Sequence, residues 1–239
     1  IYQANKKRDN ENKDIGFYSR KPLLLRGEGQ LMYNCGVCNV HACRTGEQNK
    51  MPRDCPCRDE IIEKSRKFYL QEENLRIAHN SALVESEGYC KWTRLEEIMV
   101  FANKCGFKNL GVAFCIGLSD EMKILHKVLT SNGFTVNSII CKNGGIPKEE
   151  IHITEEQKVR PNTYEAMCNP IGQALFLNKA KTDLNIILGL CVGHDSLFIK
   201  YSEAPVTIFA VKDRVLGHNP TACLYLAEGY YSKKLYKKI

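Results

Sequence analysis

The chain has 239 residues, of which 44% are hydrophobic, which is enough for one domain with an appendage or two small domains whose cores need no disulfides. No stretch approaches the roughly 18 apolar residues of a transmembrane helix, and residues 1–31 contain no apolar signal region, so we expect no membrane association. The net charge is +7, but residues 32–232 carry 23 basic and 23 acidic side chains, which argues against a nucleic-acid partner.

The basic surplus lies at the two ends of the chain. Residues 1–31 carry seven Lys or Arg against four Asp or Glu, and the tail 233–239 contains four lysines. We expect residues 1–31 to be a variable or disordered basic extension. With no secretory signal, the twelve cysteines are expected to be reduced in a cytoplasm, where clustered thiols indicate metal or redox chemistry more often than disulfides.

Residues 32–58 are predicted to form a metal-binding module. They contain the pattern C-x2-C-x4-C-x11-C, formed by Cys35, Cys38, Cys43 and Cys55, and a proline follows the last cysteine. Three thiols within nine residues, with a fourth a short loop away, can converge on one metal centre without help from the rest of the fold. Cys57 is an alternative to Cys55 as the fourth ligand.

Two metal centres compete for these four thiols. A four-cysteine zinc site usually consists of two CxxC pairs, whereas this chain has one CxxC, a third cysteine, and a later Cys-Pro. That arrangement favours a [4Fe–4S] cluster, with Zn²⁺ as the alternative. The residues also resemble the small four-cysteine [4Fe–4S] domain of electron-transport subunits and corrinoid iron–sulfur proteins. The strings that carry this resemblance are Cys35-Gly36-Val37-Cys38, Cys43-Arg44 and Cys55-Pro56.

Residues 59–105 are predicted to be helical. Apolar residues recur at three-to-four spacing through 59–86, which is typical of an amphipathic helix. Thr93 and Glu96 have the spacing of a capping box and predict a second helix, which ends at Gly106.

Residues 106–232 are predicted to form a three-layer, Rossmann-like α/β domain with a parallel sheet. Short apolar strands alternate with amphipathic helices, and this βαβ pattern is typical of parallel sheets. The predicted strands are 110–115, 135–141, 184–190 and 206–211. The predicted helices are 119–132, 163–180 with an interruption at Asn169-Pro170, a short helix from about 196, and a last helix from Asn219-Pro220 to about 231.

A second group of cysteines is predicted at one edge of this sheet. Cys115, Cys141 and Cys191 each follow or end a predicted strand, and Cys168 lies before Asn169-Pro170. Ligands of open α/β sheets bind outside the carboxyl ends of the strands. We therefore expect Cys115, Cys168 and Cys191 to share one site, either for a second cluster with an open iron or for a substrate. Cys90, Cys105 and Cys223 are interpreted as buried space-fillers.

The loop Gly193-His194-Asp195-Ser196 supplies candidate catalytic groups beside this edge. His194 is predicted to act as a general acid or base, since its ordinary pKa lies near neutrality. Asp195 and Ser196 are candidate catalytic residues, although either is also a natural N-cap for the helix that follows.

Four strings resemble a cysteine-rich bacterial and archaeal family of unknown function, number eighteen forty-seven, often labelled only a metal-binding protein. They are Cys35-Gly-Val-Cys38 with Cys43 and Cys55-Pro56, Glu165-Ala-Met-Cys168-Asn169-Pro170, Gly189-Leu-Cys191-Val-Gly193-His194-Asp195-Ser196, and Val211-Lys-Asp-Arg-Val-Leu-Gly217-His218-Asn219-Pro220. The resemblance spans residues 32–232 and implies a bound metal without a reaction.

The sequence therefore favours an iron–sulfur protein with a substrate site at the sheet edge. We expect a redox enzyme or a desulfurase-like lyase that acts on a small molecule or exchanges electrons with a partner. The alternative is a non-catalytic zinc module on a ligand-binding or partner-binding α/β domain. The sequence leaves the oligomeric state open.

Overall fold

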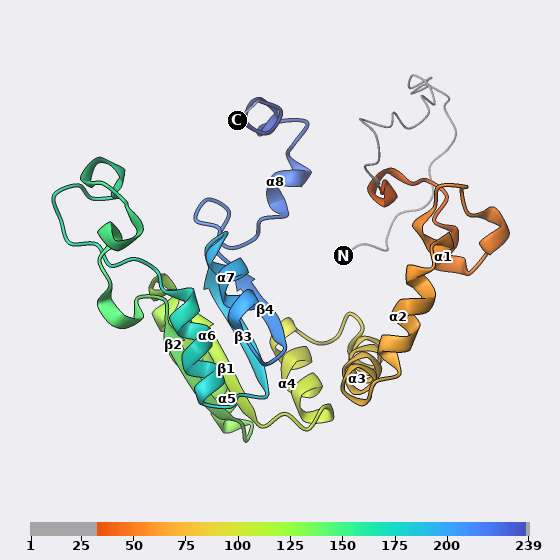
Figure 1. Ribbon diagram of the computed structural model, residues 1–239, viewed down its shortest axis with the longest axis horizontal. Coiled ribbons are helices and arrows are strands. Elements are labelled where there is room, and N and C mark those ends of the chain that lie inside the picture. Colours follow the sequence, from red (N-terminus) through yellow and green to blue (C-terminus); the bar gives the residue numbers. More distant parts are fainter. Residues whose placement is uncertain (1–32, 238–239) are drawn as a thin grey trace. The chain divides into compact units, whose positions relative to one another are not determined.

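The computed structural model describes residues 33–237, and the chain divides between Phe68 and Tyr69 into two compact parts. The predicted basic extension, residues 1–31, lies outside the described residues. The parts 33–68 and 69–237 are taken separately (Figure 1).

The part from residue 33 to 68 consists of short helical turns and one longer helix. Its elements are η1 (Cys35–Val37), α1 (Ala42–Thr45), η2 (Gln48–Lys50), η3 (Pro56–Arg58) and most of α2 (Ile61–Tyr69). Ala42 is its one buried residue. This part therefore has almost no apolar core of its own.

The part from residue 69 onward begins with two helices, α3 (Glu72–Gly88) and α4 (Arg94–Lys104). The capping box predicted at the start of α4 is confirmed, because Thr93 Oγ1 accepts from the Glu96 N–H and the Glu96 carboxylate accepts from the Thr93 N–H. The range 59–86, predicted to be helical, contains two helices, α2 and α3, which Leu70 and Gln71 separate.

Four parallel strands form the sheet: β1 (Asn109–Phe114), β2 (Thr135–Ile140), β3 (Leu184–Leu190) and β4 (Val206–Val211), in the order β2-β1-β3-β4. All four predicted strands are present within a residue of their expected bounds. β3 is buried along its whole length, as expected for a central strand of a parallel sheet.

Helices cover both faces of the sheet, which confirms the predicted three-layer α/β fold. On one face, α4 and α5 (Ser119–Ser131) pack Ile98, Ala102, Leu125 and Leu129 against alternate residues of β1 and β3. On the other face, α6 (Pro170–Lys179) and α7 (His194–Tyr201) cover the remaining residues of β1 and β3. There Ala174, Leu177 and Phe198 share a cluster with Ala113 and Ile187. Figure 1 shows α6 and α7 in front of the strands.

Two predicted helices differ from the structure. Residues 163–169 are not helical, and α6 begins at Pro170, where Asn169 caps it by accepting from the Gly172 N–H. The long last helix is replaced by two short ones, α8 (Ala222–Tyr225) and α9 (Ser232–Leu235). Within the described part of the chain, no helix combines the length and apolar character needed to cross a membrane.

The strand order creates a switch point between β1 and β3. The chain leaves β1 toward β2 on one side and returns to β3 on the other side. In open α/β sheets the crevice outside the carboxyl ends of such strands is the usual ligand site. The residues that directly follow β1 and β3 are Cys115 and Cys191.

Candidate functional site

Cys115 and Cys141 lie side by side at the carboxyl edge of the sheet. The printed register of β1 and β2 ends with Phe114 opposite Ile140, and the Cys141 N–H continues it by donating to the Phe114 carbonyl at 2.8 Å. Neighbouring strands are about 4.8 Å apart, so the two cysteines meet across the sheet. Both are buried, at 8% and 3% exposure.

Cys168 reaches the same edge from a loop. Residues 146–148 pair with 165–167 in a short antiparallel bridge, in which the Met167 N–H donates to the Ile146 carbonyl at 2.7 Å. Two residues later, the Asn169 N–H donates to the Cys141 carbonyl at 2.7 Å. Cys168 is thereby held beside Cys141, directly before α6.

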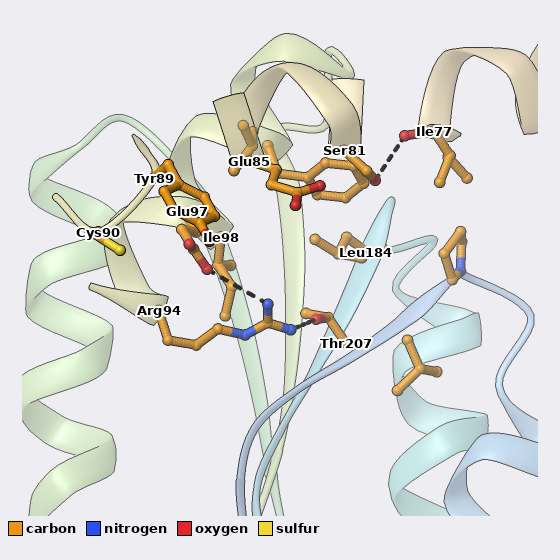
Figure 2. Close-up of a pocket in the computed structure, with 14 residues that line it drawn as sticks. Ile77, Ser81, Glu85, Tyr89, Cys90, Arg94, Glu97, Ile98, Leu184 and Thr207 are labelled. Carbon is orange, nitrogen blue, oxygen red and sulfur yellow. Dashed lines mark hydrogen bonds and ion pairs between the residues drawn. The ribbon is translucent and has the colours of Figure 1, made fainter. Parts of the chain in front are cut away.

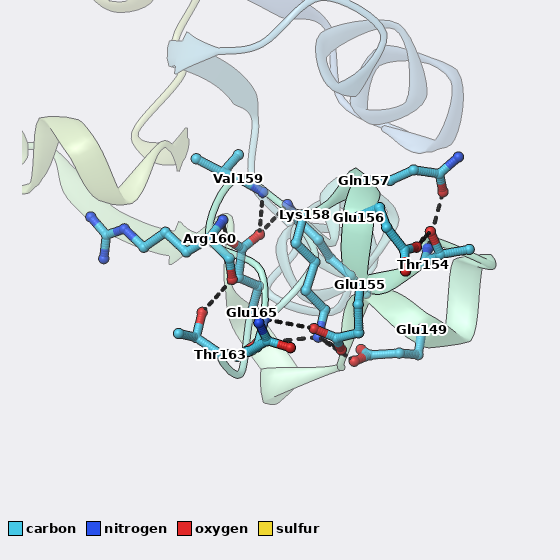
Figure 3. Close-up of polar contacts among 12 residues, drawn as sticks. Glu149, Thr154, Glu155, Glu156, Gln157, Lys158, Val159, Arg160, Thr163 and Glu165 are labelled. Atoms are coloured by element: carbon cyan, nitrogen blue, oxygen red, sulfur yellow. Dashed lines mark hydrogen bonds and ion pairs between the residues drawn. The ribbon is translucent and has the colours of Figure 1, made fainter.

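Charged side chains hold this loop, because it has little apolar surface to bury. The ammonium group of Lys158 is buried and forms ion pairs with Glu149 and Glu155, each at 2.5 Å (Figure 3). Glu165 pairs with Lys148 and also accepts from the Arg160 N–H at 2.6 Å. The loop that carries Cys168 is thus fixed by polar contacts.

The three thiols interact in a row, with Cys141 in the middle. Cys141 hydrogen bonds to Cys115 and to Cys168, and the two interactions, with burial, raise its pKa so that it stays protonated. Its sulfur also accepts from the Ile116 N–H at 3.3 Å. Cys141 therefore has a single S–H to share between two neighbouring sulfurs.

The neighbours of the two outer thiols favour their ionised forms. The hydrogen bond from Cys141, helped by the Gly117 N–H and Lys212, lowers the pKa of Cys115 to about 5 against the opposing effect of burial. The hydrogen bond from Cys141, followed by that from His194, lowers the pKa of Cys168 to about 4. Thiolates, not thiols, are nucleophiles and metal ligands.

His194 belongs to this site and contacts Cys168. The hydrogen bond to Cys168 raises the pKa of His194, against the effect of burial. A turn places the imidazole there, since the His194 N–H donates to the Cys191 carbonyl at 3.0 Å and Gly193 adopts a left-handed φ of 82°. The proximity of Cys168 and His194 therefore favours the charged forms of both side chains.

Asp195 and Ser196 lie next to His194 in the chain, and their hydrogen bonds are to each other. The Asp195 carboxylate accepts from the Ser196 N–H at 2.8 Å, and its charge helps to raise the pKa of His194. The N-cap predicted at Asp195 or Ser196 is wrong, because α7 begins at His194 and Gly193 is its N-cap. Ser196 is exposed, and the described contacts give it no partner in the row of thiols.

Cys191 lies at the edge but pairs with a cation instead of a thiol. Arg214 Nη2 donates to Cys191 Sγ at 3.2 Å. The three cysteines that interact are therefore Cys115, Cys141 and Cys168. From the sequence, Cys141 was given less weight than Cys191, although Cys141 follows β2 as Cys115 follows β1.

Cations surround the thiolates. The charges of Lys142 and Lys212 act on Cys168 and Cys115, respectively, and Arg214 is bound to Cys191. A Cβ built on Gly117 would lie 3.6 Å from Lys212 Nζ and 3.9 Å from Cys115 Sγ, so the glycine leaves room for this approach. Lys142 also donates to the Ala166 carbonyl at 2.5 Å.

The cysteines of residues 33–68 form a group of their own. Cys35, Cys38 and Cys55 line a cavity of about 240 Å³. Cys57 hydrogen bonds to Cys55 and also to Cys43, and these contacts raise its pKa. All five thiols are exposed or half-buried. The alternatives of Cys55 and Cys57 as a fourth ligand remain open, because both lie in the group.

Arg58 ties together the segment between Cys43 and Cys55. Its guanidinium donates to the carbonyls of Gln48, Met51 and Pro52 at 3.0, 2.8 and 3.1 Å. Within residues 33–237, no group of three or more His, Cys, Asp or Glu side chains is already arranged to hold a metal ion. The thiols of either group would have to move together to bind one.

The remaining three cysteines differ in how far they are buried. Cys105 is buried at 2% exposure and packs in the core beside α4, as predicted for a space-filler. Cys90 is exposed, so the same prediction is wrong for it. Cys223 is half-buried and donates to the Pro220 carbonyl at 2.9 Å.

A larger cavity of about 530 Å³ lies at the opposite edge of the sheet, which the sequence analysis did not predict. It is lined by α3, α4 and the first residues of β3 and β4, including Leu184 and Val206. Figure 2 shows Arg94 reaching across it to Thr207, with an Nη2–Oγ1 distance of 2.8 Å. Its lining includes one cysteine, Cys90, and no histidine, so we assign the chemistry to the edge where several cysteines and His194 lie together.

The family of the chain follows from comparison with known proteins. A family described as "Protein of unknown function (DUF1847)" matches residues 55–209, which include Cys115, Cys141, Cys168 and Cys191. The chain belongs to this family. An uncharacterised protein of Methanocaldococcus jannaschii is 49% identical over 201 residues, which are 84% of this chain and 97% of that protein. No solved structure matches the chain.

Proposed function

We propose that this chain is a metal-binding protein whose residues 33–58 hold a [4Fe–4S] cluster. The observation that carries the proposal is that residues 33–58 contain five cysteines, three of which line one cavity, in a segment with one buried residue, Ala42. A segment without a core needs a disulfide or a metal to hold a single conformation. Reduced thiols at this spacing favour the metal.

The spacing of the cysteines along the chain suits an iron–sulfur cluster better than zinc. Cys35, Cys38 and Cys43 supply three thiolates, and Cys55 or Cys57 supplies the fourth. Such a cluster would give the protein a one-electron carrier. Zn²⁺ on the same thiolates would serve only to hold the segment together.

We further propose that a small molecule reacts at the sheet edge, in a cytoplasmic enzyme. The contact between Cys168 and His194 supports this, since a nucleophile paired with a proton donor is the minimum machinery for such a reaction. The N-terminal cluster would then exchange electrons with a partner. The second cluster, on Cys115, Cys168 and Cys191, stays a prediction.

Anaerobic purification of the full chain, followed by assays of iron, sulfide and zinc, tests the proposal. We expect about four iron and four sulfide per chain and a brown colour. The double variant Cys35→Ser/Cys38→Ser should lose them, whereas Cys90→Ser, in an exposed position of the other part, should keep them. Stoichiometric zinc without sulfide would replace the first proposal by the alternative, and a metal-free chain would refute both.

A further inference from the structure

We propose that the cavity of about 530 Å³ between α3, α4 and the first residues of β3 and β4 binds a small organic amine with an apolar body. The Glu85 carboxylate is the counter-ion of its ammonium group. The site goes beyond the proposed function, because it uses none of the candidate metal ligands and needs no bound metal. It lies at the amino ends of β3 and β4, whereas Cys191 follows the carboxyl end of β3.

The walls of the cavity belong to one compact part of the chain and are fastened to each other. Asn80 of α3 donates to the Lys104 carbonyl of α4 at 3.3 Å, and the Lys104 ammonium group pairs with Glu87 of α3 at 2.8 Å. The turn between the helices is closely packed, because a Cβ on Gly88 would lie 2.2 Å from the Trp92 ring. The cavity is therefore a fixed feature of this part of the fold.

Apolar side chains form the inner surface of the cavity. Val84, Ile98 and Leu184 are buried, with 7%, 3% and 2% of their surface exposed, and Phe101 and Val206 are half-buried. Small-molecule sites occupy about 300–1,000 Å³ and combine such a surface with a few polar groups that fix the orientation of the ligand. This surface is suited to the hydrocarbon part of a ligand.

The charges of the lining favour a cation. Two carboxylates, Glu85 and Glu97, line the cavity with one guanidinium, Arg94. Arg94 lies 3.7 Å from Glu97 and donates to Thr207 Oγ1 at 2.8 Å (Figure 2). Within residues 33–237, Glu85 has no hydrogen bond or ion pair, so its charge is the one left uncompensated. An organic anion would meet this charge and would compete with Glu97 for Arg94.

Aromatic rings beside Glu85 add to the preference for an ammonium group. Figure 2 shows the Glu85 side chain extending from α3 toward the space between Tyr89 and Leu184. Phe101 supplies a second ring to the lining. The faces of aromatic rings attract cations, and an ammonium group can donate to a carboxylate at the same time. A primary amine attached to an apolar group therefore fits both the charge and the surface of the cavity.

Three probes that share an indole ring test the class of the ligand. Tryptamine is a cation at pH 7.5, since alkyl ammonium groups titrate near 10, whereas tryptophol is neutral and indole-3-propionate is an anion. Isothermal titration calorimetry with the full-length protein measures their affinities. We expect tryptamine to bind with one molecule per chain and several-fold more tightly than tryptophol, and indole-3-propionate to bind most weakly.

Variants of the lining test the role of Glu85. Glu85→Gln should weaken the binding of tryptamine several-fold and leave that of tryptophol unchanged, because only the charge is lost. Glu121→Gln removes the same charge from an exposed position of α5 and should leave both affinities unchanged. Ser81→Phe adds a ring at an exposed position of the lining and should abolish the binding of both probes, with urea unfolding as the measure of its stability.

Protection of Cys90 locates the site without a substitution. This thiol is exposed and lines the cavity, so saturating tryptamine should slow its alkylation by iodoacetamide. The alkylation of Cys223, which is not part of the lining, should keep its rate. Quantitative mass spectrometry of the two peptides measures both rates in one sample.

Four results would overturn the proposal. They are no binding of tryptamine at about 5 mM, binding of indole-3-propionate as tight as that of tryptamine, equal affinities of Glu85→Gln and Glu121→Gln, and bound tryptamine that leaves Cys90 unprotected. Protection of Cys90 that rises with protein concentration in the absence of any probe would instead show that a second copy of the chain covers the cavity. None of these measurements depends on the iron, sulfide or zinc content of the protein.

Discussion

At pH 7.5 Cys168 should react more slowly in the folded protein than in the unfolded protein. At pH 5 it should react faster in the folded protein. The hydrogen bonds from Cys141 and then His194 lower the pKa of Cys168 to about 4, so the folded chain keeps this thiolate over the whole range. In the unfolded chain the same cysteine is an ordinary thiol, and its thiolate fraction falls about tenfold for each pH unit below about 8.5.

The size of the effect follows from two opposing factors. At pH 5 an ordinary thiol is about 0.03% ionised, whereas a thiol with a pKa of about 4 is about 90% ionised, a gain of about 3,000-fold. The less basic thiolate is a poorer nucleophile by about a hundredfold. Folded Cys168 should therefore react about 30-fold faster than unfolded Cys168 at pH 5, and about tenfold slower at pH 7.5.

Alkylation by iodoacetamide, with quantitative mass spectrometry of the Cys168 peptide, measures both rates. The folded protein should give a nearly flat rate from pH 5 to 8, and the urea-unfolded protein a rate that rises about tenfold per unit. His194→Gln removes one of the two hydrogen bonds, so it should raise the pKa of Cys168 and slow the reaction at pH 5. If the alkylation rate of the folded protein rises with pH as steeply as that of the unfolded protein, the pKa of Cys168 is not lowered by its neighbours.

Three other changes test how the site is supported. Thr93→Ala removes the cap of α4 and should lower the free energy of unfolding in urea by about 1 kcal/mol. Gly111→Ala places a Cβ 1.9 Å from the buried Asn185 Oδ1 and should cost about 1–3 kcal/mol in the same assay. Lys158→Met leaves Glu149 and Glu155 without their cation, so limited proteolysis should cleave within 143–167 sooner than in the wild type.

Matched variants make these tests specific. Thr130→Ala, on an exposed part of α5, is the control for the cap, and a cost equal to that of Thr93→Ala would contradict the capping argument. Gly229→Ala meets its nearest atom at 3.9 Å and should be tolerated, so equal stability of the two glycine variants would contradict the packing argument. Lys179→Met, at the end of α6, should leave the proteolysis pattern unchanged.

The sheet and its edge could be predicted because local signals and burial agree there. β3 is a short apolar run with no polar residue except Asn185, and β1 and β4 are also largely apolar. The rule for parallel sheets then places whatever follows β1, β2 and β3 at one edge. That rule predicted from the sequence that Cys115, Cys141 and Cys191 lie at one edge of the sheet. In the structure Cys115 and Cys141 follow the last paired residues of β1 and β2.

The pairing within the edge could not be predicted in the same way. Cys168 arrives from a loop held by Lys158 and its carboxylates, and neither hydrophobic periodicity nor turn signals report such polar contacts. Cys191 was expected among the thiols, but Arg214 from the segment after β4 occupies its sulfur. The last helix was predicted from Asn219-Pro220 to about 231, but α8 spans only Ala222–Tyr225 and buries none of its residues.

The two groups of cysteines differ in the structure that fixes their positions. The N-terminal thiols are exposed or half-buried in a segment without a core, so their positions depend on each other and on a metal that would join them. At the sheet edge, Cys115 and Cys141 are fixed by strands, and their neighbours already stabilise two thiolates and one thiol. The fold itself therefore positions the edge thiols, whereas the N-terminal thiols lie in a segment with one buried residue.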